Sequence, residues 1–497
     1  MLACRLIPGF AFLLVATPFW SQEMHDHGVP EKLGTVSFPV SCVPAVQQDF
    51  NRSVALLHSF AYSAAQASFQ NVARLDLGCA MAHWGVAMSL FHQLWEPHLS
   101  PDAITLGERE IRLAQQVGAS SAREKGFIDA LAFIFDDGSQ IPYSTRALNY
   151  EQAMGRLAGE GRADVETRVF YALALISNAS PGDKTHSRQK RALALLEPLG
   201  RAYPDHPGIL HYEIHACDNA ELARRGLEPA RAYSRVAPSV PHALHMPSHI
   251  FTRLGLWQDS IASNLAAIDA ARHQGDTGEE LHAMDYLVYA YLQLGRNNEA
   301  DQVLQQLQGI TSLDEREFKE AYAATAMPVR CAVERHRWAA AAAIVPPQGA
   351  PPYVTAIAVW ARGLALAWGE HQSTIGAEID RLQQLESQLR DSQDDYWAVQ
   401  VKLLRQELMA WAAQASGQQQ QAFALMRETA DEEDSIEKLP VTPGPVIPAR
   451  EQLGYLLLLQ NHSTEAARQF RKALTDAPGR RGSIDGLASA TSAASQK

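Results

Sequence analysis

Apolar residues recur every three or four positions through most of this 497-residue chain. That spacing predicts amphipathic α-helices, each of which buries one face. The clearest example is PAREQLGYLLLLQNHSTEAARQFRKALTDAP, residues 448–478, which predicts two helices joined by a short polar turn. Because similar segments follow one another along the chain, we expect an all-α fold.

Small residues stand where two antiparallel helices would have to approach closely. In residues 448–478 they are Gly454, Ala466 and Ala473, and Pro478 ends the second helix. The same arrangement recurs at Phe60-Tyr62-Ala65-Phe69, at Trp84-Gly85, at Gly295 with Ala300, and at Ala410 with Gly417 and Ala422. Over about residues 44–480 the chain therefore resembles the tetratricopeptide-repeat (TPR) family. The resemblance implies an α-solenoid of about nine or ten antiparallel helix pairs, and implies little about function.

The two ends of the chain differ from this pattern. Residues 1–22 combine a positive Arg5 with an apolar run that is too short to cross a bilayer. They predict a secretory signal peptide, with an uncleaved anchor as the alternative. Residues 23–43 show no helical period and predict an extended N-terminal arm. Residues 481–497 predict a flexible C-terminal tail, either a fraying helix or a disordered segment. Whether the arm brings its histidines, His25 and His27, to another site is left open.

Charge and cysteine content narrow the functional classes. The formal net charge of −12 argues against a nucleic-acid-binding protein, which would carry a basic face. No second stretch is apolar enough to span a membrane once the signal is removed. Cys42 and Cys79 flank the first predicted helix pair, so we expect them to form a disulfide in an oxidising compartment. Cys217 and Cys331 are expected to be small buried residues.

Seven of the 18 histidines fall between residues 211 and 282, and six of them, all except His273, stand at matching helical spacings. Histidines three or four positions apart lie on one face of a helix. In a TPR array, which this chain resembles, the matching positions of the inner helices line the concave groove. The residues expected to line it are His211, His215, His242, His245, His249, Arg253, His282 and Asp285. Pro247 should kink the helix that carries three of the histidines, which leaves their relative directions open.

One hypothesis for this cluster is a metal site. Neutral imidazole binds zinc, copper and iron. The candidate ligands are His211, His215, His242, His245, His249, His282 and Asp285. Asp285 or Glu213 could instead orient a ring from outside. Three ligands with an open fourth position would permit hydrolysis or redox chemistry. The spacing does not decide whether the protein is an enzyme.

The other hypothesis is a binding groove. The imidazoles, with Tyr286, Tyr289, Arg253 and Asp285, would then contact a protein, a peptide or a small molecule. Inter-repeat packing of the histidines is the third alternative. We take the binding or scaffold function as the main expectation and the metal-dependent enzyme as the alternative.

Several segments also resemble a group of exported bacterial TPR proteins. These segments are SFPVSC, ALLHSF, CAMAHWG, HALHMPSHIF and TPGPVIPAR. The resemblance implies a periplasmic or secreted protein and names no reaction.

Overall fold

The computed structural model describes residues 31–94, 99–135, 141–159, 164–311, 313–314, 317–369 and 375–495. The predicted signal peptide and the first part of the N-terminal arm, with His25 and His27, lie outside the described residues. The features described here lie within one compact unit, Lys32–Lys497.

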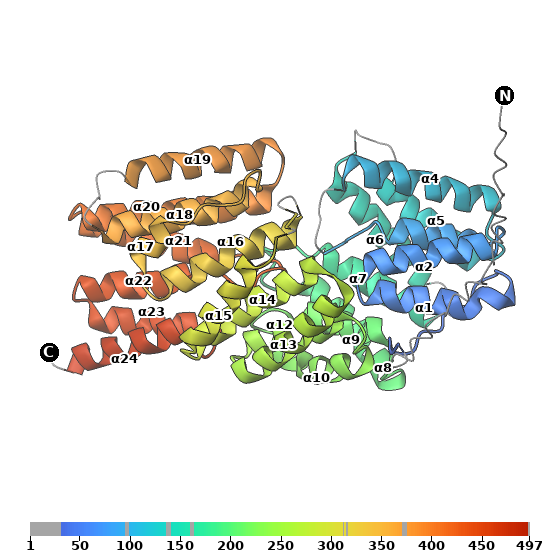
Figure 1. The fold of residues 1–497 in the computed structure, drawn as a ribbon, viewed down its shortest axis with the longest axis horizontal. Helices are drawn as coiled ribbons and strands as arrows, with labels where there is room; N and C mark the ends of the chain where they lie inside the picture. Colours follow the sequence, from blue (N-terminus) through green and yellow to red (C-terminus); the bar gives the residue numbers. More distant parts are fainter. Residues whose placement is uncertain are drawn as a thin grey trace, which may run out of the picture. The chain divides into compact units, whose positions relative to one another are not determined.

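The described residues form helices and no β-strand (Figure 1). Helices α1 to α8 are Gln47–His58, Tyr62–Leu75, Ala80–Met88, Pro101–Val117, Ala122–Phe135, Tyr143–Gly159, Val165–Ser177 and Ser187–Ala202. Helices α9 to α16 are Pro207–Cys217, Leu227–Val236, Pro241–His245, Pro247–Arg253, Trp257–Gln274, Thr277–Gln293, Asn297–Gln308 and Phe318–Val333. Helices α17 to α24 are Trp338–Ala342, Pro352–Trp368, Ile375–Asp391, Asp395–Ala415, Gln419–Asp434, Ala449–Leu459, Ser463–Asp476 and Arg481–Ser495. Short 3₁₀ helices span Pro44–Val46 and Ala223–Gly226.

Consecutive helices pack as pairs from α1 with α2 to α22 with α23, which confirms the all-α, TPR-like solenoid. The small residues act as predicted. A Cβ atom on Gly85 would lie 2.2 Å from the Phe69 ring, and one on Gly454 would lie 2.6 Å from the Phe470 ring. Only glycine lets the two helices of each pair approach this closely. Inner helices also contact the next inner helix, as α7 does α9 and α14 does α16, so each repeat is buried by its neighbours.

The extended segment before α1 is part of the hydrophobic core. Phe38 is fully buried, and its ring centroid lies 5.4 Å from that of Phe50 and 5.2 Å from that of Phe127. A disulfide joins Cys42 to Cys79, the pair expected from the sequence. The disulfide and the buried Phe38 together fix this segment to the first repeats.

The C-terminal residues differ from the expectation of a flexible tail over residues 481–497. Residues 481–495 form α24, which packs against α22 and α23. Ser483, Gly486 and Ala490 are buried on one face of α24 because they recur at helical spacing and are small enough for a close contact. The solenoid therefore continues past residue 480.

The loop between α21 and α22, residues 435–448, returns to the middle of the solenoid. The hydroxyl of Tyr286 on α14 lies within donating distance of the backbone carbonyls of Pro440 (3.1 Å) and Thr442 (3.0 Å). Arg330 on α16 donates to the carbonyl of Gly444 at 3.0 Å. We call this segment the crossing loop. It covers the inner helices that carry the histidines.

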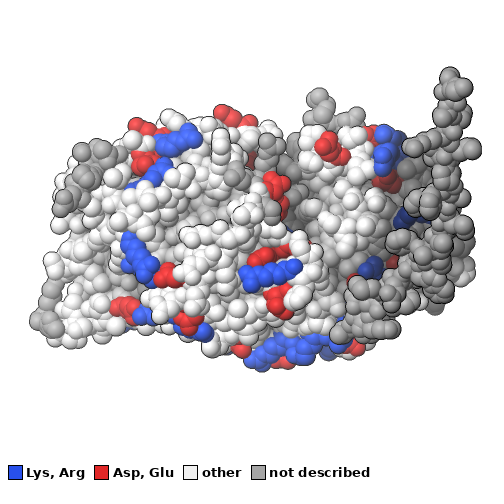
Figure 2. All heavy atoms as spheres, viewed as in Figure 1, with Lys and Arg blue, Asp and Glu red and all other residues white. Residues whose placement is uncertain are grey.

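The surface gives no sign of a dedicated charged interface on the face in view. Figure 2 shows acidic and basic side chains interspersed over its described part. None of the described helices combines the length and apolar composition that a membrane span requires.

Candidate metal centre

The six predicted histidines lie together inside the solenoid. His211 and His215 are on α9, His242 and His245 on α11, His249 on α12 and His282 on α14. None of the six is more than 6% exposed. The six rings therefore form no open surface, because the crossing loop and the turn between α1 and α2 cover them.

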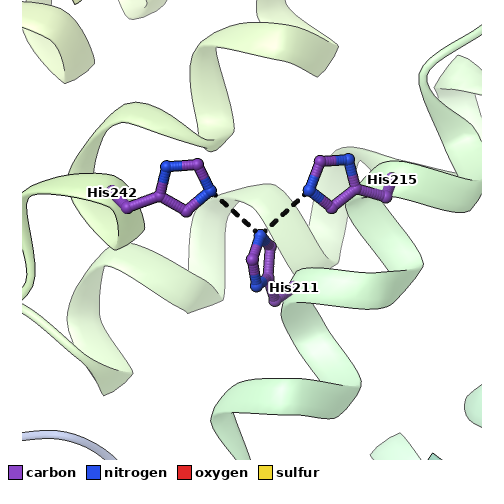
Figure 3. A group of neighbouring side chains, drawn as sticks. All are labelled: His211, His215 and His242. Carbon is purple, nitrogen blue, oxygen red and sulfur yellow. Dashed lines mark hydrogen bonds between the residues drawn. The ribbon is translucent and has the colours of Figure 1, made fainter. Parts of the chain in front are cut away.

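His211, His215 and His242 form one group, which we call the first triad. The Nε2 atom of His211 lies 3.0 Å from Nε2 of His215 and 3.2 Å from Nε2 of His242. Figure 3 shows the three rings, from two different helices, directing these nitrogens toward one another. One nitrogen from each ring lies within 4.8 Å of the other two, which is close enough to share one ion.

His245, His249 and His282 form the second triad. The Nε2 atoms of His245 and His249 lie 3.0 Å apart, and the ring centroids of His245 and His282 are 4.2 Å apart. Here too, one nitrogen from each ring lies within 4.8 Å of the others. Each triad thus combines two histidines four positions apart with one histidine from the next inner helix.

The break between α11 and α12 explains this division. Pro247 begins α12 and interrupts the helix after His245, as its sequence predicted. His242 is directed to the first triad, whereas His245 and His249 belong to the second. The two triads are nevertheless adjacent. Ring centroids are 6.0 Å apart for His215 and His249, and 6.2 Å apart for His242 and His245.

Four of the six rings are oriented by an oxygen acceptor at the nitrogen that faces away from the triad. The Nδ1–H groups donate to the carbonyl of His58 (from His211, 2.6 Å), Glu279 (from His242, 3.1 Å), Asn264 (from His245, 2.7 Å) and Asp218 (from His249, 2.9 Å). The amide of Asn264 is itself fixed, because its Nδ2 donates to the carbonyl of Ser260. Metal-binding histidines typically have this second contact, which sets the tautomer and the ring direction.

These acceptors leave unprotonated nitrogens facing each other. A neutral imidazole that carries its proton on Nδ1 has only a lone pair on Nε2. His211 and His242 meet through two such nitrogens, and so do His245 and His249. Two lone pairs 3.0–3.2 Å apart repel unless a cation lies between them. Ligand bonds of ~2.0–2.1 Å in a tetrahedral arrangement place neighbouring nitrogens about 3.3 Å apart, close to the observed spacing.

A proton shared between two Nε2 atoms would not replace that cation, because the rings are hard to protonate. Burial holds the pKa values of His211, His215, His245 and His282 well below their ordinary range. Burial also lowers the pKa of His249 to about 4, although Asp218 opposes the shift. These rings are therefore neutral near pH 7, which is the form that binds metals.

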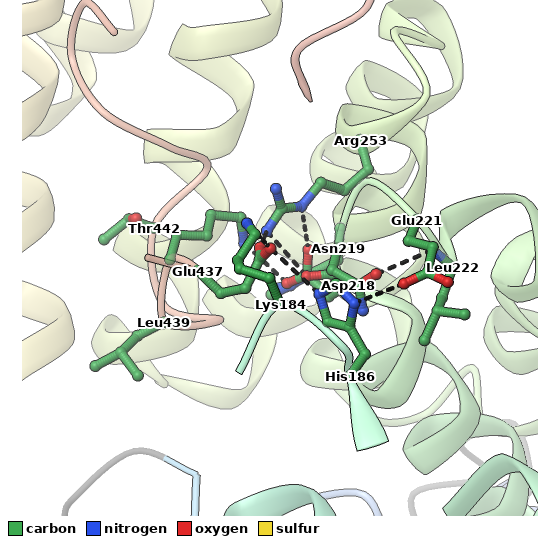
Figure 4. Close-up of polar contacts among 12 residues, drawn as sticks. Lys184, His186, Asp218, Asn219, Glu221, Leu222, Arg253, Glu437, Leu439 and Thr442 are labelled. Atoms are coloured by element: carbon green, nitrogen blue, oxygen red, sulfur yellow. Dashed lines mark hydrogen bonds and ion pairs between the residues drawn. The ribbon is translucent and has the colours of Figure 1, made fainter. Parts of the chain in front are cut away.

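Asp218 links the second triad to the crossing loop. Its carboxylate accepts from His249, from Arg253 Nε at 2.8 Å and from Lys438 Nζ at 2.8 Å. Burial alone would raise the pKa of Asp218, but the two cations and the His249 hydrogen bond hold it well below its usual value. Figure 4 shows Arg253 directed at Asp218. Arg253 therefore anchors the carboxylate, and it also lines a cavity of about 170 Å³ beside the crossing loop.

Asp285 does not join the histidines, which corrects the sequence-based ligand set. Its carboxylate accepts from Arg330 at 2.9 Å, and both side chains are buried. Burial raises the pKa of Asp285, although Arg330 opposes the shift. Asp285 lies three positions after His282 on α14, but it faces α16. Glu213 is also elsewhere, beside Gly200 of α8.

Phe60 was assigned only a repeat-packing role by its sequence pattern, yet it covers the first triad. Its ring centroid lies 4.4 Å from that of His211, 5.7 Å from that of His215 and 5.6 Å from that of His242. Its backbone is left-handed, with φ of 54°. That conformation is costly for a bulky residue, and such strain is concentrated at functional sites.

A third cluster resembles a metal site by composition only. Glu166 lies between His58 and His206, at 2.8 Å and 3.0 Å from their Nε2 atoms. The hydroxyl of Tyr212 contacts the other nitrogen of His58 at 2.9 Å. Burial would raise the pKa of Glu166, but the two histidines lower it to about 2. Each histidine thus has a carboxylate oxygen to donate to, and the cluster holds the His58 carbonyl that orients His211.

Comparisons with known proteins support no functional assignment. The chain matches no protein-family model and no curated protein sequence. Among solved structures, it is similar to the human IFIT1 dimer with m7Gppp-AAAA, at 12% identity over 84% of this chain and 82% of that chain, with a TM-score of 0.38. It is also similar to the P58(IPK) TPR domain, at 11% identity over 91% of this chain and 99% of that chain, with a TM-score of 0.25. At these scores nothing about ligands is transferred to this chain.

Proposed function

We propose that the protein is a metalloprotein that holds two transition-metal ions side by side, one in each histidine triad. The observation that carries the proposal is the pairing of unprotonated nitrogens: His211 with His242, and His245 with His249. A positive ion between each pair turns this repulsion into coordination. Inter-repeat packing alone does not explain this arrangement. The acceptors outside each triad hold the ring protons on Nδ1, so the lone pairs on Nε2 point toward one another.

The donor set indicates the class of metal. Six imidazoles with no carboxylate among them favour copper or zinc, with iron as a further candidate, over magnesium, calcium or manganese. Three protein ligands leave a coordination position for water or a substrate. A metal with such an open position supplies Lewis-acid or redox chemistry, so a metal-dependent enzyme becomes the leading function.

This proposal replaces the histidine-lined binding groove. Rings that are at most 6% exposed offer no surface to a protein or peptide. The helical repeats remain the scaffold, and their inner helices position the ligands.

The test is the metal content of the full-length protein after reconstitution with copper or zinc. We expect about two equivalents in the parent, since each triad supplies the three protein ligands of one open site. His242→Ala should leave about one, and so should His282→Ala, because each removes one ligand from a different triad. The matched control is His273→Ala on α13, whose side chain is 77% exposed and which should keep both ions. A parent protein that stays metal-free, with its helical circular dichroism intact, overturns the proposal.

We also infer that the protein is exported. The predicted signal peptide and the Cys42–Cys79 disulfide support this, because such disulfides persist in oxidising compartments. Fractionation of bacterial cells should place the protein in the periplasm or the medium, and retention in the cytoplasm with reduced Cys42 and Cys79 would contradict the inference.

A further inference from the structure

A cavity of about 210 Å³ lies against the first triad. His215 forms part of its wall, and so does Asp218, which orients His249 of the second triad. Lys438, Leu439 and Pro440 of the crossing loop also line it. A molecule in this cavity would lie beside a metal ligand and beneath the loop.

The cavity is too small for a peptide. Pockets for drug-sized ligands are ~300–1,000 Å³, so this one suits a smaller molecule. Much of its wall is apolar or aromatic, with Ile176, Leu439, Tyr143 and Tyr396 among the lining residues. These side chains favour a compact ring over an extended polar chain.

The charged groups in the wall already have partners. Lys438 is ion-paired with Asp218 at 2.8 Å. Glu437 is paired with Lys184 and lies 3.2 Å from a ring nitrogen of His186, as Figure 4 shows. A charged ligand would have to be desolvated without gaining a new counter-ion, so the wall favours a neutral one.

One polar atom in the wall needs a donor. The Oε1 atom of Gln189 is buried and has no hydrogen-bond partner among the described residues. Gln189 lines the cavity, and a ligand hydroxyl would reach this covered oxygen after a rotation of the Gln189 side chain toward the cavity. Buried polar groups are rarely left without a partner, which makes this atom an indicator of ligand chemistry.

We propose that this cavity binds a small neutral aromatic alcohol, of the phenol class, beside the ion held by the first triad. The position of the ligand next to a metal rests on the proposed function, whereas the size, wall and hydrogen-bonding of the cavity do not. The aromatic ring would pack on the apolar wall, and its hydroxyl would donate to Gln189.

The first test is a calorimetric titration of the metal-loaded, full-length protein with phenol, toluene and benzoate. Phenol should bind, toluene should bind ~10-fold more weakly because it lacks the hydroxyl, and benzoate should bind least because it is charged. Equal affinity for all three compounds, or no binding of phenol, overturns the inference.

Two variants separate the cavity from the metal. Gln189→Leu should weaken phenol binding ~10-fold, and Ile176→Trp should abolish it by filling the cavity, while both retain their metal. Gln400→Leu makes the same change in a different cavity and should leave phenol binding unaltered. Undiminished phenol binding in both Gln189→Leu and Ile176→Trp overturns the assignment of this cavity.

The two proposals fail in distinguishable ways. Metal loading without phenol binding removes the phenol site and leaves the metal centre. Phenol binding that depends on Gln189 in a protein that takes up no metal supports the cavity and overturns the metal centre. In copper-loaded protein, phenol should also shift the visible absorption of the metal, and an unchanged spectrum on saturation would contradict its place beside the ion.

Discussion

At the residue scale, the acceptors behind the rings determine whether three histidines form a metal site or a hydrogen-bonded cluster. In the third cluster, Glu166 lies between His58 and His206 and takes a hydrogen bond from each. In the two triads the acceptors lie on the outside, so lone pairs point inward. The same residue type therefore serves two purposes, distinguished by where the proton is held.

Glu279→Gln tests this view of the first triad. The substitution keeps an acceptor for His242 but removes the negative charge, so metal affinity at that triad should fall ~10–100-fold. A competition titration with a chelator measures the change. Glu280→Gln, one position along α14, is the control, because Glu280 pairs with Arg272 and contacts no histidine of either triad.

Glu279 also pairs with the partly buried Lys319 at 2.5 Å, so a loss of affinity could come from a disturbed fold. The double variant Glu279→Gln/Lys319→Met removes both charges. It should restore stability but not affinity. Full metal affinity in either variant would show that Glu279 does not tune the site.

Sequence spacing located the six histidines but could not choose their acidic neighbours. Glu279 and Asp285 each lie three positions from His282, in opposite directions along α14. Both could reach the same face in an isolated helix. The choice depends on Lys319 and Arg330, which come from the next inner helix and draw the two carboxylates to different places.

At the element scale, the kink at Pro247 and the crossing loop shape the site. The kink was predictable, because proline interrupts a helix wherever it occurs inside one. Its consequence was not, because the division of the histidines between two triads depends on how α11 and α12 pack against α9 and α14. The sequence of the crossing loop is acidic and rich in proline, which is typical of a linker. Its residues give no indication that the loop covers the histidines.

Tyr286→Phe tests how the crossing loop is held. It removes the hydroxyl that contacts the carbonyls of Pro440 and Thr442, so the loop should open more often. Hydrogen exchange over residues 438–443 should become faster, and metal loss to a chelator should accelerate. The control is Tyr291→Phe on the same helix. Equal exchange in Tyr286→Phe and the parent would show that these contacts do not hold the loop.

At the scale of the whole molecule, the solenoid was predictable, but the contacts between its distant repeats were not. Repeat patterns encode contacts between neighbours, such as Gly85 with Phe69. Contacts between distant repeats have no periodic signature. One of them is the bond from Trp257 on α13 to the carbonyl of Gly479, 222 positions away. Such contacts join the C-terminal repeats to the middle of the solenoid.

Arg480 is the clearest example of a single residue that joins distant repeats. It is 1% exposed and pairs with Glu451 of α22 at 2.8 Å and with Glu334, which follows α16, at 3.2 Å. It also donates to the carbonyl of Val446 in the crossing loop. Two buried carboxylates thus depend on one guanidinium.

Arg480→Met should therefore destabilise the protein by ~3–5 kcal/mol, because it leaves buried carboxylates without a counter-ion. The free energy of unfolding, measured in urea, gives the value. Arg481→Met is the matched control: its side chain is 51% exposed, and its pair with Asp485 should contribute less than ~1 kcal/mol. Loss of equal size in the two variants would contradict the role of Arg480.

The pH dependence distinguishes lost charge pairing from lost packing. Burial already raises the pKa of Glu334, although Arg480 opposes the shift, and removing Arg480 should raise it further. A carboxyl group whose pKa is raised in the folded state does not affect stability below its unfolded pKa. Above that pKa it lowers the free energy of unfolding, and the loss grows as the pH rises to the folded pKa. The defect of Arg480→Met should accordingly be smaller at pH 5 than at pH 8, and Arg480→Met/Glu334→Gln should show a weaker pH dependence. A loss of unfolding free energy that is the same at pH 5 and pH 8 would show that Arg480 acts through packing. It would contradict the view that its charge holds the distant repeats together.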